Sequence, residues 1–160
     1  MPLPETMGPE NEVDPRHLKA MGLTLITCIK QAFRRGHLTC GMTACAELLQ
    51  RDPETIMFCL LPADATDVAA NIHQMLIEAF CHENLIPILK TGDQQKVAAL
   101  VNKLTSGNTE HAVKGDAKDT TCLLLQCCKL GPSKQEETLT HFYNDMMANP
   151  HPMPYLTLPD

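Results

Sequence analysis

Cysteine is the residue whose abundance in this sequence most invites a chemical interpretation. The 160-residue chain contains eight Cys, among them Cys40 and Cys45 five positions apart and the adjacent pair Cys127 and Cys128. Zinc sites of the finger or knuckle type need paired ligands separated by roughly two to four residues. Neither group of cysteines has that spacing, so the sequence predicts no metal site.

A thiol, an imidazole and a carboxylate are adjacent in Cys81-His82-Glu83. We expect this triplet near the end of a helix, where consecutive side chains point about 100° apart and a Cys–His pair does not meet easily. The negative end of the helix dipole also disfavours a thiolate. Because phosphate-binding, dinucleotide-binding and serine-hydrolase motifs are absent as well, we predict no catalytic residue, no cofactor and no enzymatic activity.

Residues 71–84 predict a helix that is apolar on two sides. His73 lies on its flank, and two interpretations of this imidazole stay open. It is either a boundary histidine bonded to a neighbour, which is favoured, or a polar contact within a protein interface. Ile77 lies away from the main apolar stripe. That stripe has i, i+3, i+4, i+7 spacing and consists of Ile72, Met75, Leu76, Ala79 and Phe80.

Composition narrows the class of protein. The formal net charge of −6 and the pI of about 5.6 argue against a broad phosphate-binding surface, so nucleic acid is not an expected partner. The polar, acidic N-terminal stretch has no apolar signal-peptide core, and no apolar run is long enough to cross a bilayer. We therefore expect reduced thiols, no membrane association, and a location in the nucleus and cytoplasm.

The elements that must position these residues alternate between helix and strand. Their order predicts an α/β fold: a three-layer α/β/α sandwich with a mixed, four- to five-stranded sheet and about five helices. We expect a disordered tail over residues 1–13, one domain over 14–160, and a flexible polar loop over 105–119. Helices are expected at 14–35, 42–51, 66–84, 93–104 and from 133, and strands at 37–41, 56–61, 85–90, 122–128 and 155–158.

Several helix and strand ends carry local signals. Asp14 and Pro15 suit the start of the first helix, and Gly36 suits its end. Asp14, Asp67 (or Thr66) and Asp93 are expected N-caps, Ser133 and Glu136 form a predicted capping box, and Pro87 places its strand at an edge or beside a bulge.

Three stretches then resemble a known family. LTCGMTACAELLQRDPETIMFCLLPAD, DVAANIHQMLIEAFCHENLIPIL and the ending PYLTLP are similar to the growth-arrest and DNA-damage-inducible stress proteins. The expected order of elements agrees with that family over roughly residues 18–160. The most specific parts are the -DP- after the second helix, the I-H…L-I-x-A-F-C-x-E-N block and the -LP- near the C-terminus.

The resemblance implies a fold shared with ribosomal proteins that bind kinked RNA, and no enzymatic activity. It implies an inducible adaptor that regulates cell-cycle arrest and stress-activated MAP kinase signalling. The implied partners are a MAP kinase kinase kinase, a cyclin-dependent kinase with its cyclin, an inhibitor of that kinase, and proliferating cell nuclear antigen. It also implies homodimers, or hetero-oligomers with paralogues, formed through the second and third helices.

By this analogy the third helix uses one apolar stripe to cover the sheet and offers its other face to a partner. Both interpretations, core and interface, remain open for Leu49 and Leu76, whereas an interface position is preferred for Ile77. The full set of predicted partner or dimer-interface residues is Met42, Cys45, Ala46, Leu49, His73, Leu76, Ile77 and Phe80.

The sequence also departs from the family pattern. The acidic run that the family uses in kinase-complex binding is reduced here to PADATD, with only Asp64 and Asp67. Because fewer acidic residues produce a weaker negative electrostatic potential, we expect less electrostatic steering toward a basic partner. The alternative function is an RNA-binding module, which the shared fold suggests. It is not favoured, because Gly41 is followed by no basic residue until Arg51.

Overall fold

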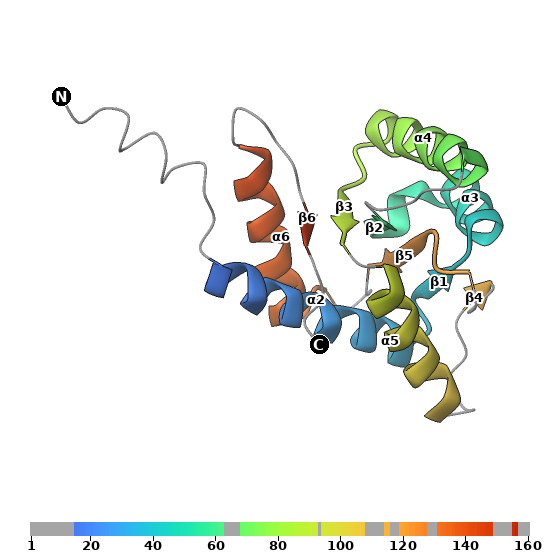
Figure 1. Cartoon of the computed structure of the whole chain (residues 1–160). Coiled ribbons are helices and arrows are strands. Elements are labelled where there is room, and N and C mark those ends of the chain that lie inside the picture. Colours follow the sequence, from blue (N-terminus) through green and yellow to red (C-terminus); the bar gives the residue numbers. More distant parts are fainter. Residues whose placement is uncertain are drawn as a thin grey trace.

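The computed structural model describes residues 15–62, 68–92, 94–107, 114–115, 119–127, 131–148 and 155–156. Its centre is a mixed β-sheet with helices on both faces (Figure 1). This arrangement confirms the predicted three-layer α/β/α sandwich. The α-helices are α2 (Pro15–Arg35), α3 (Met42–Arg51), α4 (Val68–Glu83), α5 (Gln94–Gly107) and α6 (Lys134–Met147).

The sheet has the strand order β4-β1-β5-β2-β3-β6. Strand β5 is antiparallel to both of its neighbours, whereas β2 and β3 run parallel, as do β1 and β4 and also β3 and β6. The strands are β1 (Leu38–Cys40), β2 (Ile56–Pro62), β3 (Ile88–Thr91), β4 (Lys114–Gly115), β5 (Leu123–Gln126) and β6 (Tyr155–Leu156).

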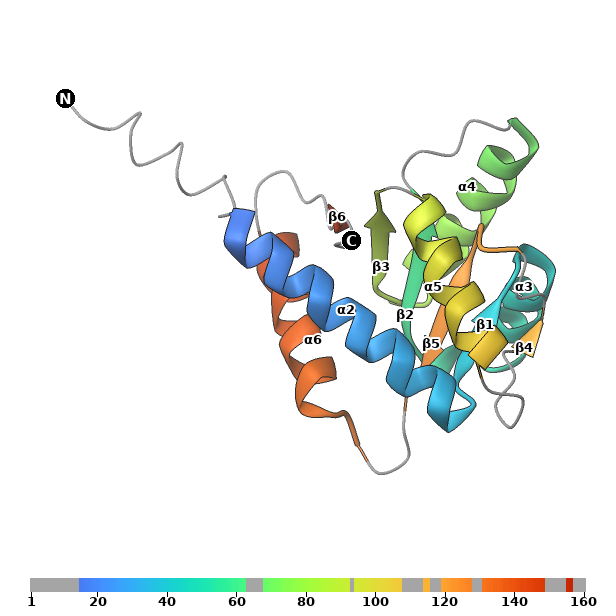
Figure 2. The same cartoon turned by 60° about the horizontal axis from the view of Figure 1, so that its bottom comes forward.

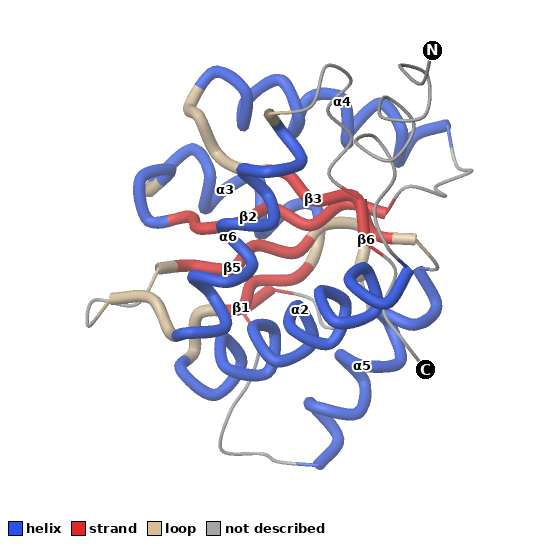
Figure 3. Tube along the Cα trace, turned by 90° about the vertical axis from the view of Figure 1, so that its left-hand side faces the viewer, coloured by secondary structure: helices blue, strands red, loops and turns tan. Residues whose placement is uncertain are grey.

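Helices α2, α5 and α6 cover one face of the sheet, with α2 running alongside α6 (Figure 2). Helices α3 and α4 cover the other face (Figure 3). Each face has its own core because successive strand residues point to opposite sides. In β2, for example, Phe58 and Leu60 enter the first core, whereas Cys59 and Leu61 enter the second.

The local end signals of two helices are confirmed. Gly36 follows α2 with a φ of 73°, in the left-handed region that glycine adopts without a steric penalty. At the start of α6, Ser133 Oγ accepts a hydrogen bond from the Glu136 backbone N–H, while Glu136 Oε1 accepts one from the Ser133 N–H at 2.7 Å. This is the predicted capping box.

The orientation of α4 differs from the sequence prediction. Ile72 and Met75, which were expected to cover the sheet, are more than half exposed, and so is Leu76, for which core and interface positions were both open. Ile77, for which an interface position was preferred, is 6% exposed. Gln74 and Cys81 are buried on the same side as Ile77. The prediction was wrong because an apolar pattern on two faces leaves the rotation of a helix undetermined, and packing on the sheet and α3 then decides it.

The segment between α4 and β3 also differs from the prediction. β3 begins after Pro87 and lies between β2 and β6, so it is not an edge strand in the described sheet. Before it, Leu85 has a φ of 58°, and the Ile86 N–H donates to the Cys81 carbonyl at 2.8 Å. This is a Schellman helix end with a leucine where glycine is usual.

Parts of the expected loop over 105–119 form regular structure. Helix α5 continues to Gly107, and β4 at 114–115 pairs in parallel with β1. The other loop positions before Asp119 lie outside the described residues, as do the expected N-terminal tail, the three aspartates Asp14, Asp67 and Asp93 with the alternative cap Thr66, and Asp64 of the reduced acidic segment.

Candidate functional site

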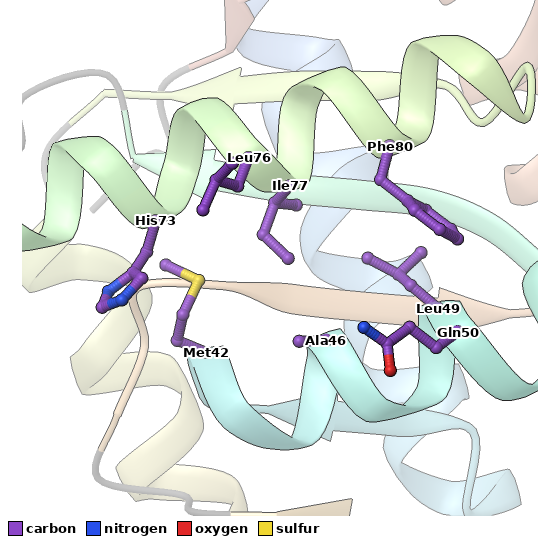
Figure 4. Close-up of a pocket in the computed structure, with 8 residues that line it drawn as sticks. All are labelled: Met42, Ala46, Leu49, Gln50, His73, Leu76, Ile77 and Phe80. Atoms are coloured by element: carbon purple, nitrogen blue, oxygen red, sulfur yellow. The ribbon is translucent and has the colours of Figure 1, made fainter.

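An open groove of about 340 Å³ lies between α3 and α4 (Figure 4). We call it the α3–α4 groove. Its walls are mostly aliphatic, with Gln50 and His73 as the polar members. The lining residues are Met42, Ala46, Leu49, Gln50, His73, Leu76, Ile77 and Phe80.

Helical periodicity explains how each wall is formed. On α3, Met42, Ala46 and Leu49 are spaced i, i+4 and i+7, which places them on one side of the helix. On α4, the spacing i, i+4 and i+7 again unites His73, Ile77 and Phe80. The two stripes face each other across the groove in Figure 4.

The floor and the rim of the groove differ in exposure. Leu49 and Ile77 form a buried floor and belong to the core on this face of the sheet. Along the α4 rim, Ile72, Met75 and Leu76 are 54%, 67% and 64% exposed. We call these three residues the α4 ridge. A ridge of large apolar side chains beside an apolar groove is the kind of surface that marks interaction sites.

Seven of the eight residues predicted for an interface line this groove. Cys45 is the exception, since it is fully buried beneath α3. The sequence prediction missed Gln50, although its i+4 spacing from Ala46 could have indicated it. The structure thus brings the predicted residues together, while their role in binding stays a prediction.

The Cys81-His82 pair does not form a nucleophilic dyad. The Cys81 side chain is buried and His82 is exposed, so the two point to different sides of α4. A hydrogen bond with Cys59 and burial both raise the pKa of the Cys81 thiol. A protonated, covered thiol is a poor nucleophile.

The start of α3 is occupied by a carboxylate of the chain itself. The Met42 backbone N–H donates to Asp119 Oδ2 at 3.1 Å, and the Thr121 N–H donates to Oδ1 at 3.1 Å. Burial acts to raise the pKa of Asp119, but the hydrogen bonds from Thr121 and Met42 outweigh it and hold this pKa below its usual value. Nearby, a Cβ on Gly115 would stand 2.2 Å from the Cys40 carbonyl oxygen, so only glycine fits there.

Among the described residues, no three His, Cys, Asp or Glu side chains are grouped so that they could hold a metal ion. None of the described helices combines the length and the apolar character needed to cross a membrane.

Comparison with known proteins decides the family. Residues 25–121 match the model of the ribosomal protein L7Ae/L30e/S12e/Gadd45 family. The chain belongs to this family. The match spans α3 and α4, and therefore the whole α3–α4 groove.

Within the family, the chain is similar to the growth arrest and DNA damage-inducible proteins. It is 34% identical over 148 residues to GADD45 gamma of Homo sapiens and 33% identical over the same length to GADD45 gamma of Rattus norvegicus, with 89% of each chain covered. It is 32% identical over 129 residues to GADD45 alpha of Cricetulus griseus, covering 78% of this chain and 77% of the relative. The resemblance inferred from the three sequence stretches is thereby confirmed.

A solved structure of a protein with unknown function from Bacillus halodurans C is also similar. It has a TM-score of 0.48 and 14% sequence identity, and the alignment covers 72% of this chain and 92% of that one.

Proposed function

We propose that this member of the growth arrest and DNA damage-inducible family is a non-enzymatic stress-response adaptor of the nucleus and cytoplasm. It regulates cell-cycle arrest and stress-activated MAP kinase signalling by binding other proteins. Its partners are a MAP kinase kinase kinase, a cyclin-dependent kinase with its cyclin and its inhibitor, and proliferating cell nuclear antigen. The chain also associates with itself or with paralogues.

The observation that carries the proposal is the α4 ridge beside the α3–α4 groove. Ile72, Met75 and Leu76 expose more than half of their side chains although the neighbouring Ile77 is buried. Large apolar groups in contact with water favour association because burying them releases free energy, about 25 cal/mol for each Å² of apolar surface. A docking role explains why these residues are apolar, whereas a free surface gives no reason for it.

The occupant of the groove is a second copy of the chain. A twofold interface brings the same patch of both subunits together, so the patch must be complementary to itself. A ridge adjoining a groove of similar chemistry meets this requirement, because the ridge of one subunit can enter the groove of the other. Leu76 is central, since it belongs to the ridge and also lines the groove.

Sedimentation of the unsubstituted chain and two matched variants tests this interface. Leu76→Glu places a charge on the ridge, whereas Leu23→Glu places one on α2, which covers the opposite face of the sheet, at a leucine that is 51% exposed. We expect Leu76→Glu to weaken self-association by at least about 30-fold, the effect of a central interface residue. Leu23→Glu should leave association unchanged.

Equal melting temperatures of the two variants show that neither result comes from unfolding. An unsubstituted chain that stays monomeric at about 100 µM, roughly the weak limit of specific pairing, contradicts the dimer. A dimer that tolerates Leu76→Glu contradicts the assignment of the groove.

Partner capture tests the adaptor role separately. We expect the purified chain to retain a MAP kinase kinase kinase from solution, with retention that falls as salt rises where acidic residues contribute. The contribution of Asp64 and Asp67, in the reduced acidic segment, is tested by substituting both with Asn. Failure to retain any of the named partners contradicts the adaptor role even if the dimer forms.

The alternative function is RNA binding through the start of α3. Asp119 weighs against it, because its carboxylate already accepts the Met42 N–H and repels a phosphate at that place. We expect no shift of a kinked RNA in a gel at moderate salt. Tight, salt-sensitive binding would favour the RNA-binding module over the adaptor.

A further inference from the structure

Positive charge is concentrated on one helix of this acidic protein. The chain has a formal net charge of −6, yet α2 holds five of its 13 Lys and Arg residues and none of its 19 Asp and Glu residues. Charges of one sign on a single element create a local positive potential on a molecule of opposite net charge. No binding role described above uses this helix.

The stability of α2 explains only part of this charge. Arg34 and Arg35 lie in the last turn, where a cation interacts favourably with the negative end of the helix dipole. The first turn holds no acidic residue, although an acidic residue would be stabilising there. Lys30 and Arg34 are four residues apart, a spacing at which like charges repel each other. The basic residues before the last turn therefore need another explanation.

Three of these basic residues share one side of α2 with two apolar residues. Positions 19, 23, 26, 30 and 34 are separated by three or four residues, so at 100° per residue they lie within about 80° of the helix circumference. We call this set the α2 stripe, and it consists of Lys19, Leu23, Ile26, Lys30 and Arg34. Such spacing is typical of a helix side that packs along one other helix.

The α2 stripe faces away from the sheet. Leu23 is 51% exposed, whereas Leu25 and Ile29, on the opposite side of the helix, are fully buried in the core. None of the described elements lies in front of α2 in Figure 2. The ion pairs between described residues involve no basic residue of the stripe. The charges of the stripe are therefore available to a partner.

The order of residues along the stripe defines the partner that fits it. Leu23 and Ile26 form an apolar centre, with Lys19 before it and Lys30 and Arg34 after it. Lys19 and Lys30 are separated by about 16 Å along the helix axis. A complementary helix has apolar residues at its middle and carboxylates about three turns apart on either side of them.

Nucleic acid and anionic membranes fit this surface less well. Both present a broad array of negative charge, and all 19 acidic residues of the chain lie outside α2, where they repel such an array. Phosphate groups also offer no apolar counterpart to Leu23. A single helix is only about 10 Å wide and can contact the stripe alone.

We propose that the α2 stripe docks an acidic amphipathic helix of another protein. Leu23 and Ile26 pack against the apolar centre of that helix, while the basic residues at both ends of the stripe pair with its carboxylates. The α3–α4 groove stays free, because α2 covers the opposite face of the sheet. The two surfaces can then be occupied at the same time.

The test measures the fluorescence anisotropy of a labelled, stapled helical peptide of about 18 residues as the full-length chain is added. One side of this peptide carries two central leucines flanked by glutamates at the spacing of the stripe, and its other positions are neutral. We expect a dissociation constant of about 1–50 µM, which rises with salt because ions screen the charge pairs. A peptide of the same composition in scrambled order should bind at least about 10-fold more weakly.

Two charge-matched double variants locate the site. Lys19→Glu/Lys30→Glu reverses the charge at both ends of the stripe and should weaken peptide binding by at least about 30-fold. Lys103→Glu/Lys134→Glu makes the same change in net charge at exposed lysines of α5 and α6. This control should change the affinity by no more than about threefold. Equal losses in the two variants contradict the site.

Two single substitutions separate the apolar contact from the charges and from self-association. Leu23→Ser keeps every charge but removes the exposed centre of the stripe, and we expect it to weaken binding by about 10-fold. Leu76→Glu, on the α4 ridge, should leave peptide binding unchanged even where it prevents self-association. Full binding by Leu23→Ser would contradict the apolar centre.

Two results overturn the proposal. One is an unsubstituted chain that binds the ordered and the scrambled peptide equally well or binds neither at about 100 µM. The other is tighter binding of a DNA duplex or of phosphatidylserine vesicles that is lost in Lys19→Glu/Lys30→Glu, since the stripe would then serve a polyanion and not a protein helix.

Discussion

The face of the sheet under α2, α5 and α6 is closed, whereas the face under α3 and α4 ends in an open groove. Three helices, of 21, 14 and 14 residues, cover the first face, and two helices, of 10 and 16 residues, cover the second. The sheet is apolar on both sides, so the second face lacks the helical surface needed to bury all of its apolar neighbours. The closed side therefore has the more completely covered core, and the open side is the one to which we assign the proposed docking of a second copy.

The two faces also differ in their buried polar groups. On the closed side, Glu136 is 1% exposed and accepts hydrogen bonds from the Ser133 N–H and from the Arg35 guanidinium, which is 3.3 Å away. On the open side, the buried groups include the thiols of Cys45, Cys59, Cys81 and Cys122, which make weaker hydrogen bonds. The closed face is thus fastened by a contact between α2 and α6 whose carboxylate is buried, whereas the ion pair on the open face, between Glu78 of α4 and Lys90 of β3, is partly exposed on both sides.

The largest expected effect compares one leucine from each face. Leu139 and Leu49 are 0% and 1% exposed, but only Leu49 borders the groove. We expect Leu139→Ala to lower the free energy of unfolding by about 4 kcal/mol and Leu49→Ala by about 2–3 kcal/mol, because the space left at Leu49 opens into the groove and is not a sealed cavity. Urea unfolding measures both values, and an equal loss would contradict the difference between the faces.

The next effect concerns the charged contact on the closed face. Glu136→Ala leaves the Ser133 N–H and the Arg35 guanidinium without their acceptor, and we expect a loss of about 2–3 kcal/mol. Glu137→Ala is the control, because its exposed carboxylate lies in the same first turn of α6. The control should cost no more than about 0.5 kcal/mol by the same unfolding measurement. If the two substitutions cost the same, the buried contact does not fasten α2 to α6.

A stabilising substitution is expected at the end of α4. Leu85 is 90% exposed and has a left-handed backbone, which costs a non-glycine residue about 1–2 kcal/mol. Glycine relieves this strain but loses more entropy on folding, so we expect Leu85→Gly to raise stability by about 0.5–1 kcal/mol. Glu83→Gly, two positions earlier at the last residue of α4, should lower it by about 1 kcal/mol. If both variants have melting temperatures below that of the unsubstituted chain, the assigned helix end is contradicted.

The smallest expected effect is on acid stability near the groove. The pKa of Asp119 in the folded protein lies below its ordinary value of 3.8, so its contribution is present above about pH 4 and is lost as the pH falls through the folded pKa. Asp119→Asn should therefore lose less stability than the unsubstituted chain between about pH 6 and about pH 3. Urea midpoints at the two pH values measure this difference. Asp145→Asn, at an exposed position on α6, serves as the control.

The sequence by itself determined most of the elements and several of their ends. Local signals act over a few residues, and they correctly placed α3, β2 and the capping box at Ser133. The sequence also identified seven of the side chains that line the groove, because i, i+4 and i+7 spacing places them on one side of each helix.

Only the tertiary structure decided which side of α4 faces inward. Both sides of this helix are apolar, so periodicity alone could not fix its rotation. The prediction placed Ile77 outside and Ile72 and Met75 against the sheet, the reverse of what is observed, and it left Leu76 open. The buried thiols under α3 and α4 are a second such case. Cys59 Sγ and Cys122 Sγ are 4.0 Å apart although the two residues are 63 positions apart in the sequence. Only the long-range pairing of β2 with β5 brings them together, because local spacing carries no information about which elements become neighbours.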